Sequence, residues 1–88
     1  MNQKESLRNI KIGRIYRHFK GDLYLVRDIA EHSETNEPLV IYQKLYDDGS
    51  LYARPAHMWL EPVDHQKYPD VKQTLRFELQ DIASVVAK

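Results

Sequence analysis

Residues 39–54 read LVIYQKLYDDGSLYAR, and this stretch decides the fold. Its first half is mostly aliphatic and aromatic, which favours a strand. The DDGS that follows is a strong hairpin signal, because Gly49 readily takes the positive φ of a tight turn. We therefore predict a strand at 39–46, a turn, and a return strand at 51–54.

The turn also predicts how these two strands pair. If residues 48–49 form a two-residue loop, Tyr46 lies opposite Leu51 and Lys44 lies opposite Ala53. A three-residue loop shifts this register by one residue.

Further strands flank this hairpin in the sequence. Residues 14–19 alternate between two faces, and a KGD turn separates them from the apolar residues 23–30. The polar stretch 31–37 indicates a loop, and 58–63 indicates a fifth, short strand. Five short strands with tight turns predict a mainly β domain, built as a small barrel or a sandwich.

The apolar sides of these strands predict the core. On the central strand, Leu39, Ile41 and Leu45 share the face that looks better suited to burial. The core residues that we predict are Ile15, Phe19, Leu25, Ile41, Leu45 and Leu60.

The C-terminal part has a different pattern. Its apolar residues recur at helical spacing after Asp70, a suitable N-cap, and the helix is best supported over 78–87. Such a stripe is typical of a face that covers a core or forms a dimer seam. It lacks the basic polar face of a membrane anchor. The stripe consists of Val71, Leu75, Leu79, Ile82 and Val86.

Length and composition narrow the class of protein. The 88 residues suit one domain, and the absence of cysteine excludes disulfides, a thiol nucleophile and thiolate metal ligands. The sequence shows neither a signal peptide nor the ~18 apolar residues of a membrane span, so a cytoplasmic protein is expected.

The net charge is zero, but the charges are unevenly distributed. Residues 1–20 carry +5 and residues 21–48 carry −5, and the remainder is balanced. We predict that these two segments form neighbouring strands whose charges pair. Arg17 and Arg54 could likewise pair with the acidic loop 31–37.

Several long motifs resemble a known family. The motifs are GRIYRHFKG at 13–21, HSET at 32–35, VIYQKLY at 40–46, and Arg54-Pro55 followed by MWLE at 58–61. Over about residues 13–78 they resemble a small bacterial and phage family called domain of unknown function 1653. The resemblance implies an SH3-like small β-barrel and no defined activity.

The chain differs from the family pattern near its C-terminus. A longer segment, 65–74, precedes the Arg76-Phe77 that usually closes the domain, and the helical tail follows. The resemblance makes Arg76-Phe77 extended, so we expect a strand at 75–78 with the helix after it. The expected division is a basic arm at 1–12, the barrel at 13–78 and the helix at 79–88.

Candidate chemical sites are few. His32, Glu34 and His57 are suitable metal ligands, but their spacing matches no established site, so we expect no required metal or cofactor. A Ser33–His32 nucleophile pair is excluded, because adjacent side chains of an extended chain point apart.

An aromatic stripe with a lysine is the remaining feature. Tyr42, Lys44 and Tyr46 share one face of their strand, as in surfaces that stack single-stranded nucleic acid or nucleotides. The alternative is that Val40, Tyr42 and Tyr46 pack under the C-terminal helix.

We predict a non-enzymatic binding module for an anionic ligand such as RNA or a nucleotide. The acidic loop, with His32, Ser33 and Glu34 behind the site, would border it and disfavour duplexes. The alternatives are a protein-interaction module that uses the barrel edge or the 79–86 stripe, and a small metal-dependent or acid/base enzyme using His32 and Glu34. The predicted ligand-binding residues are Arg17, His18, Tyr42, Lys44 and Arg54.

Overall fold

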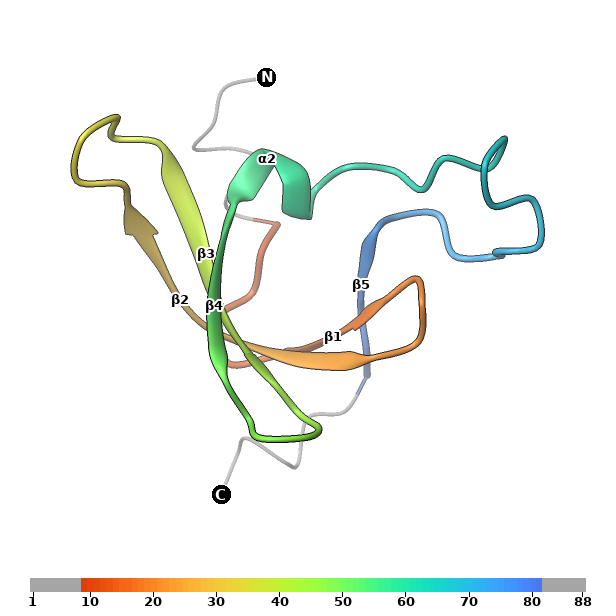
Figure 1. Cartoon of the computed structure of the whole chain (residues 1–88), viewed down its shortest axis with the longest axis horizontal. Coiled ribbons are helices and arrows are strands. Elements are labelled where there is room, and N and C mark those ends of the chain that lie inside the picture. Colours follow the sequence, from red (N-terminus) through yellow and green to blue (C-terminus); the bar gives the residue numbers. More distant parts are fainter. Residues whose placement is uncertain (1–8, 82–88) are drawn as a thin grey trace.

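The computed structural model describes residues 9–81, which form one antiparallel sheet and a short helix (Figure 1). The sheet order is β4-β3-β2-β1-β5, and the edge strands β4 and β5 do not pair with each other. The fold is therefore mainly β, as predicted, in the form of an open sheet. The elements are β1 (Ile15–His18), β2 (Leu23–Glu31), β3 (Pro38–Lys44), β4 (Leu51–Pro55), α2 (Ala56–Trp59) and β5 (Phe77–Leu79).

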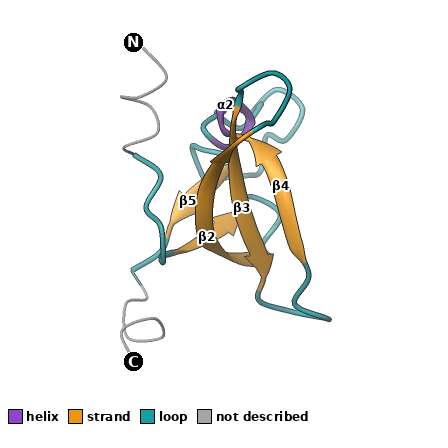
Figure 2. Cartoon of the chain, turned by 90° about the vertical axis from the view of Figure 1, so that its left-hand side faces the viewer, coloured by secondary structure: helices purple, strands orange, loops and turns teal. Residues whose placement is uncertain are grey.

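The sheet curls strongly around its concave face (Figure 2). The β2–β3 register shifts between Val26 and Asp28, a bulge of the kind that bends and twists a strand. The curl is strong enough that the rings of Tyr42 on β3 and Phe77 on β5 lie 5.9 Å apart, although β2 and β1 separate their strands in the sheet.

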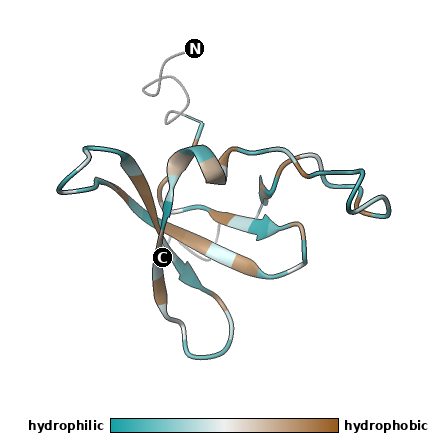
Figure 3. Cartoon of the chain, turned by 45° about the horizontal axis from the view of Figure 1, so that its top comes forward, coloured by the Kyte–Doolittle hydropathy of each residue, from teal (hydrophilic) through white to brown (hydrophobic). Residues whose placement is uncertain are grey.

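Trp59 of α2 fills the concave face. Its ring stacks on Phe77 at a centroid distance of 3.7 Å and meets the rings of Tyr42 and Tyr16 edge-on. Hydrophobic residues are located mainly in the strands and in α2, whereas the β2–β3 turn is hydrophilic (Figure 3). The buried hydrophobic residues are Ile10, Ile15, Tyr16, Val26, Val40, Tyr42, Ala56, Trp59, Val63 and Phe77.

The central strand has the opposite face buried from the one that the sequence predicts. Val40 and Tyr42 are buried, whereas Ile41 is only half-buried and Leu45 is 40% exposed. The reason is the curl: the concave face receives Trp59, and the Tyr42 ring fills more of that space than an aliphatic side chain can. The predicted burial of Ile15 is confirmed. Phe19, Leu25 and Leu60 are half-buried.

The β3–β4 turn is longer than predicted, so the predicted pairing is wrong. Gln43 lies opposite Leu51, and the amide of Lys44 donates to the carbonyl of Ser50 at 3.0 Å. Residues 45–49 therefore form the loop. Within this loop Asp47 has a positive φ of 55° and Gly49 a positive φ of 68°. The loop thus contains two residues in the left-handed region, which Gly and Asp adopt more readily than most residues.

The predicted strand at 58–63 is also wrong. Residues 56–59 form α2, which follows Pro55 directly and buries Ala56 and Trp59 on one side. A short apolar run fits either a strand or a helical turn, and here burial of Trp59 decides in favour of the turn. Beyond α2, Pro62 forms an isolated bridge with Leu75, and the amide of Val63 donates to the carbonyl of Thr74 at 2.8 Å.

The C-terminal strand is confirmed, whereas the helical stripe is not. β5 covers the second half of the expected strand at 75–78 and extends one residue beyond it, and neither Val71 nor Leu75 is helical. Leu79, where the predicted helix should begin, belongs to β5. The rest of that helix, from residue 82, lies outside the described residues, as does most of the predicted basic arm. In the described chain, no helix has the length and apolar character needed to cross a membrane.

The two charged segments are neighbours in the sheet, but the predicted pairing of Arg17 and Arg54 with the acidic loop 31–37 is not formed in the described chain. β1 and β2 are adjacent, as predicted. Between residues 9 and 81, however, the ion pairs join Lys44 to Asp47 and Asp48, and Arg76 to Glu61. None of them involves Arg14, Arg17, Lys20 or Arg54.

Candidate anion-binding pocket

A pocket of about 500 Å³ opens where the β1–β2 turn, β4 and the segment between α2 and β5 meet. Figure 1 shows this segment, in cyan to light blue, at the same end of the molecule as the orange β1–β2 turn. Its charged side chains give the lining a net charge of +2 when His18 is neutral. The cations are Lys20, Arg54, Lys67 and Arg76, and the carboxylates belong to Glu61 and Asp64.

Arg54 is held in the pocket by the aromatic core. On β4 it lies opposite Val40, so its side chain shares the concave face with that of Tyr42. Its Nε donates to the Tyr42 hydroxyl at 3.2 Å, and its guanidinium carbon lies 5.4 Å from the centre of the Phe77 ring. Within residues 9–81 no carboxylate forms an ion pair with it. Its guanidinium is therefore oriented by neutral groups and keeps its charge available.

Arg76 reaches the pocket from the residue before β5. Its amide donates to the carbonyl of Glu61 at 2.8 Å, and its Nη2 lies 3.8 Å from the Glu61 carboxylate. In the described chain the Nε of Arg76 is buried without a hydrogen-bond partner. A buried donor without a partner is uncommon, so protein groups leave this guanidinium incompletely satisfied.

His18, at the end of β1, reports the positive potential of the pocket. Its pKa is lowered to about 4, first by burial and then by the positive charges of Arg54, Arg76 and Lys20. The ring is therefore neutral at pH 7. Because Nδ1 accepts a hydrogen bond from the Lys20 amide at 3.1 Å, the proton of the neutral ring is on Nε2, which can donate.

Lys67 and Tyr68 come from the loop that follows α2. The Asp64 carboxylate accepts hydrogen bonds from the amides of Gln66 and Lys67, at 3.0 and 3.3 Å, and so shapes this turn. The Tyr68 ring packs against Phe19 at 4.9 Å, and the Lys67 ammonium lies 5.5 Å from the Tyr68 ring centre. The loop thus adds one cation and one aromatic ring to the pocket.

Of the five predicted ligand-binding residues, the pocket contains His18 and Arg54. Arg17 is exposed and follows Tyr16 on β1, so it lies on the other side of the strand from its buried neighbour. Tyr42 is only 6% exposed and is surrounded by other rings, so it orients Arg54 and offers no free face to a base.

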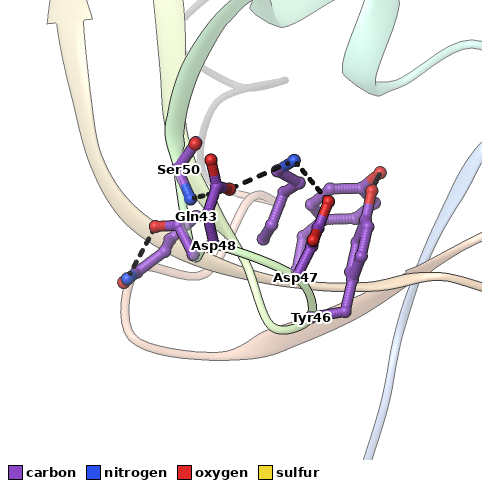
Figure 4. A network of polar contacts seen from close by, with 8 residues as sticks. Gln43, Tyr46, Asp47, Asp48 and Ser50 are labelled. Carbon is purple, nitrogen blue, oxygen red and sulfur yellow. Dashed lines mark hydrogen bonds and ion pairs between the residues drawn. The ribbon is translucent and has the colours of Figure 1, made fainter.

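Lys44 lies instead at the far end of the hairpin, in a cluster of its own. Its ammonium lies 3.8 Å from the Asp47 carboxylate and 3.3 Å from that of Asp48, and its side chain is 12% exposed. Figure 4 shows the two carboxylates turned toward one ammonium group. The rings of Tyr46 and Tyr52 lie 5.4 and 5.5 Å from the same ammonium. We call these five residues the hairpin cluster; its cation already has partners.

The residues of the predicted acidic border do not reach the pocket. His32, Ser33 and Glu34 belong to the β2–β3 turn, and loop 31–37 contributes nothing to the lining. The Nδ1 of His32 accepts from the amides of Glu34 and Thr35, at 3.1 and 3.4 Å, which is a turn-capping role. Within residues 9–81 no three histidine or carboxylate side chains gather in a way that could hold a metal ion.

Sequence reasoning missed nine of the eleven lining residues, and four of these carry the argument for an anion site: Lys20, Lys67, Tyr68 and Arg76. Lys20 and Arg76 stood inside recognised motifs, where they were interpreted as part of a turn and as the end of the domain. Lys67 and Tyr68 lie in a loop with no periodic pattern, and only their contacts across the chain reveal them. Arg76 could have been predicted from its position directly before Phe77, because a residue next to a strand that closes the domain is held at a fixed place.

The comparison with known families agrees with the resemblance in the sequence. The model of a family described as protein of unknown function, DUF1653, matches residues 14–79. The chain belongs to the DUF1653 family. A crystal structure of a DUF1653 protein from Bordetella bronchiseptica is 32% identical, with a TM-score of 0.67, and the match covers 81% of this chain and 87% of that one. No curated protein matches the chain.

The DUF1653 match runs from the start of β1 to the end of β5. It therefore includes every residue that lines the pocket. The family description names no activity, so the function has to be argued from the pocket itself.

Proposed function

We propose that this chain is a non-enzymatic binding module whose basic pocket takes an anionic ligand, with the phosphate of a nucleotide or of RNA as the ligand class. In this proposal the curled sheet is an SH3-like barrel left open between β4 and β5. The ligand-binding residues are His18, Lys20, Arg54 and Arg76.

One observation carries the proposal: Arg54 and Arg76 line the same pocket with donors that protein groups leave unused. Arg54 has no carboxylate partner within residues 9–81, and the buried Nε of Arg76 has no acceptor there. Guanidinium groups bind phosphate through several charge-assisted hydrogen bonds, which are stronger than neutral ones. The neutral His18 adds an Nε2 donor without adding charge.

Two variants and a calorimetric titration test the proposal. AMP and a short single-stranded RNA are titrated into the chain at low and moderate salt. Arg54→Ala should weaken AMP binding roughly tenfold to a hundredfold, because it removes one charge-assisted hydrogen bond to the phosphate. RNA affinity should fall steeply with salt. Arg17→Ala is the matched control, because it removes an exposed arginine from outside the pocket.

The proposal is wrong if neither probe binds at low salt. It is also wrong if Arg54→Ala and Arg17→Ala bind equally well. Thermal melts of both variants check that the fold is retained, so that a loss of binding can be assigned to the missing guanidinium.

The exposed apolar residues favour a second function, docking of a protein partner along β4. Leu45, Tyr46, Leu51 and Tyr52 are 38–60% exposed around the β3–β4 turn, beside an edge strand. Contiguous apolar patches and free strand edges are both used in protein association. Such an interface would respond little to salt, which separates it from phosphate binding.

A further inference from the structure

We propose that the pocket has two anion subsites, so that its ligand carries two phosphoryl groups on one molecule. This inference rests on the proposed function and specifies its ligand. The first subsite is formed by Arg54, Arg76 and His18, and the second by Lys67 on the loop after α2. Lys20, whose ammonium lies 5.9 Å from the Phe19 ring centre, is between the two.

The first subsite is built on the rigid part of the fold. The Arg54 guanidinium and the His18 ring both lie over or against Phe77, at 5.4 and 5.0 Å from its centre. Arg76 precedes Phe77 in the chain, and its positive charge acts on His18 together with that of Arg54. These three groups therefore surround one point beside the buried Phe77 ring.

The second subsite is separated from the first by a row of rings. The His18 ring stacks on Phe19 at 4.5 Å, and Phe19 packs against Tyr68 at 4.9 Å. The Lys67 ammonium lies 5.5 Å from the Tyr68 ring centre, at the Tyr68 end of this row. Two ring contacts thus connect His18 with Tyr68, so a phosphate held beside Phe77 would leave Lys67 for a second anionic group.

The carboxylates of the pocket do not remove the charge of Lys67. Asp64 faces the amides of its own turn, and Glu61 pairs with Arg76. Between residues 9 and 81, Lys67 forms no ion pair. The pocket volume of about 500 Å³ is within the range of small-ligand sites, so both subsites can be occupied by one molecule.

Binding of AMP and of adenosine 3′,5′-bisphosphate by the parent chain and by Lys67→Ala tests this inference. The parent should bind the bisphosphate roughly tenfold more tightly than AMP, because a second charge-assisted contact forms. Lys67→Ala should remove most of that difference and leave AMP binding within about twofold of the parent. Lys72→Ala, an exposed lysine of the same loop outside the pocket lining, is the matched control and should behave like the parent.

The outcomes separate the two proposals. If AMP binds but the bisphosphate has no advantage, or if Lys72→Ala reduces that advantage as much as Lys67→Ala does, the second subsite is wrong and the proposed function stands. If neither compound binds the parent, the proposed function itself is wrong.

Discussion

The pocket and the hairpin cluster are built from the same kinds of side chain. Each places cations on tyrosine or phenylalanine rings, and each lies on the concave side of the curled sheet. They differ in their counter-charges. The ammonium of Lys44 has two carboxylates from its own turn, whereas Arg54 in the pocket has none within the described chain.

A cation beside aromatic rings is therefore not by itself evidence of a binding surface. In the hairpin cluster the arrangement closes a turn, and the Lys44 side chain is largely covered. In the pocket the same kinds of side chain leave donors without partners, and burial together with the nearby cations lowers the pKa of His18. A ligand site is therefore indicated by charged groups and donors that have no partner within the protein.

The largest effect is expected where the two regions share their support. Trp59 is 1% exposed and contacts Phe77, beside the pocket, and Tyr42, which leads to the hairpin cluster through Tyr52. Trp59→Ala should lower the free energy of unfolding by about 3–5 kcal/mol, because it empties the concave face. Urea denaturation measures this loss. A loss below about 1 kcal/mol would mean that the rings are not the common core of both regions.

Acid should destabilise the pocket region first. The pKa of His18 is lowered to about 4 by burial and by Arg54, Arg76 and Lys20, while Asp22 opposes the shift. The unfolded chain therefore binds a proton at higher pH than the folded chain does, and stability falls as pH drops from about 6.5 to 4. We expect a loss of about 1–2 kcal/mol, less than the full shift because the ring is partly solvated.

Denaturation of His18→Gln at several pH values checks this assignment. The variant should lose less stability than the parent between pH 6.5 and 4. An identical pH profile for the two chains would show that folding does not lower the pKa of His18.

The hairpin cluster should respond at lower pH and more weakly. The pKa of Asp48 is lowered to about 2, first by the hydrogen bonds from Ser50 and then by Lys44. A depressed carboxyl pKa stabilises the folded state above the unfolded value of about 3.9, and this contribution is lost as pH falls through 2. By carboxyl-carbon NMR titration, Ser50→Ala and Lys44→Met should each raise the Asp48 pKa. A pKa that neither substitution changes would contradict the assigned causes.

Most strands could be predicted from local sequence, because each has its own apolar residues and its own turn signals. The prediction failed where contacts between distant residues decide which side chains are buried and which conformation a segment adopts. Ile41 looked like a better core residue than Tyr42, and only the curl that brings Phe77 and Trp59 over β3 reverses that choice. Trp59 itself was assigned to a strand for the same reason.

The candidate site was predictable only in part. His18 and Arg54 lie within recognised motifs, whereas Lys67 and Tyr68 enter the pocket because their loop folds back on Phe19. Lys44 illustrates the opposite case. It had the expected aromatic neighbours, but the longer turn gave it two carboxylates. Turn length and counter-charge depend on three-dimensional contacts that a single sequence does not contain.

The account is tested most directly by an NMR titration of the isotopically labelled chain with AMP at low salt. It predicts that amide shifts concentrate at residues 18–20, 54, 61–68 and 76, and that the pKa of His18 rises from about 4 as the bound anion offsets the charges of Arg54 and Arg76. Signals of Tyr46 and Tyr52 should stay unchanged. Shifts centred on the hairpin cluster, with an unchanged His18 pKa, would contradict the account.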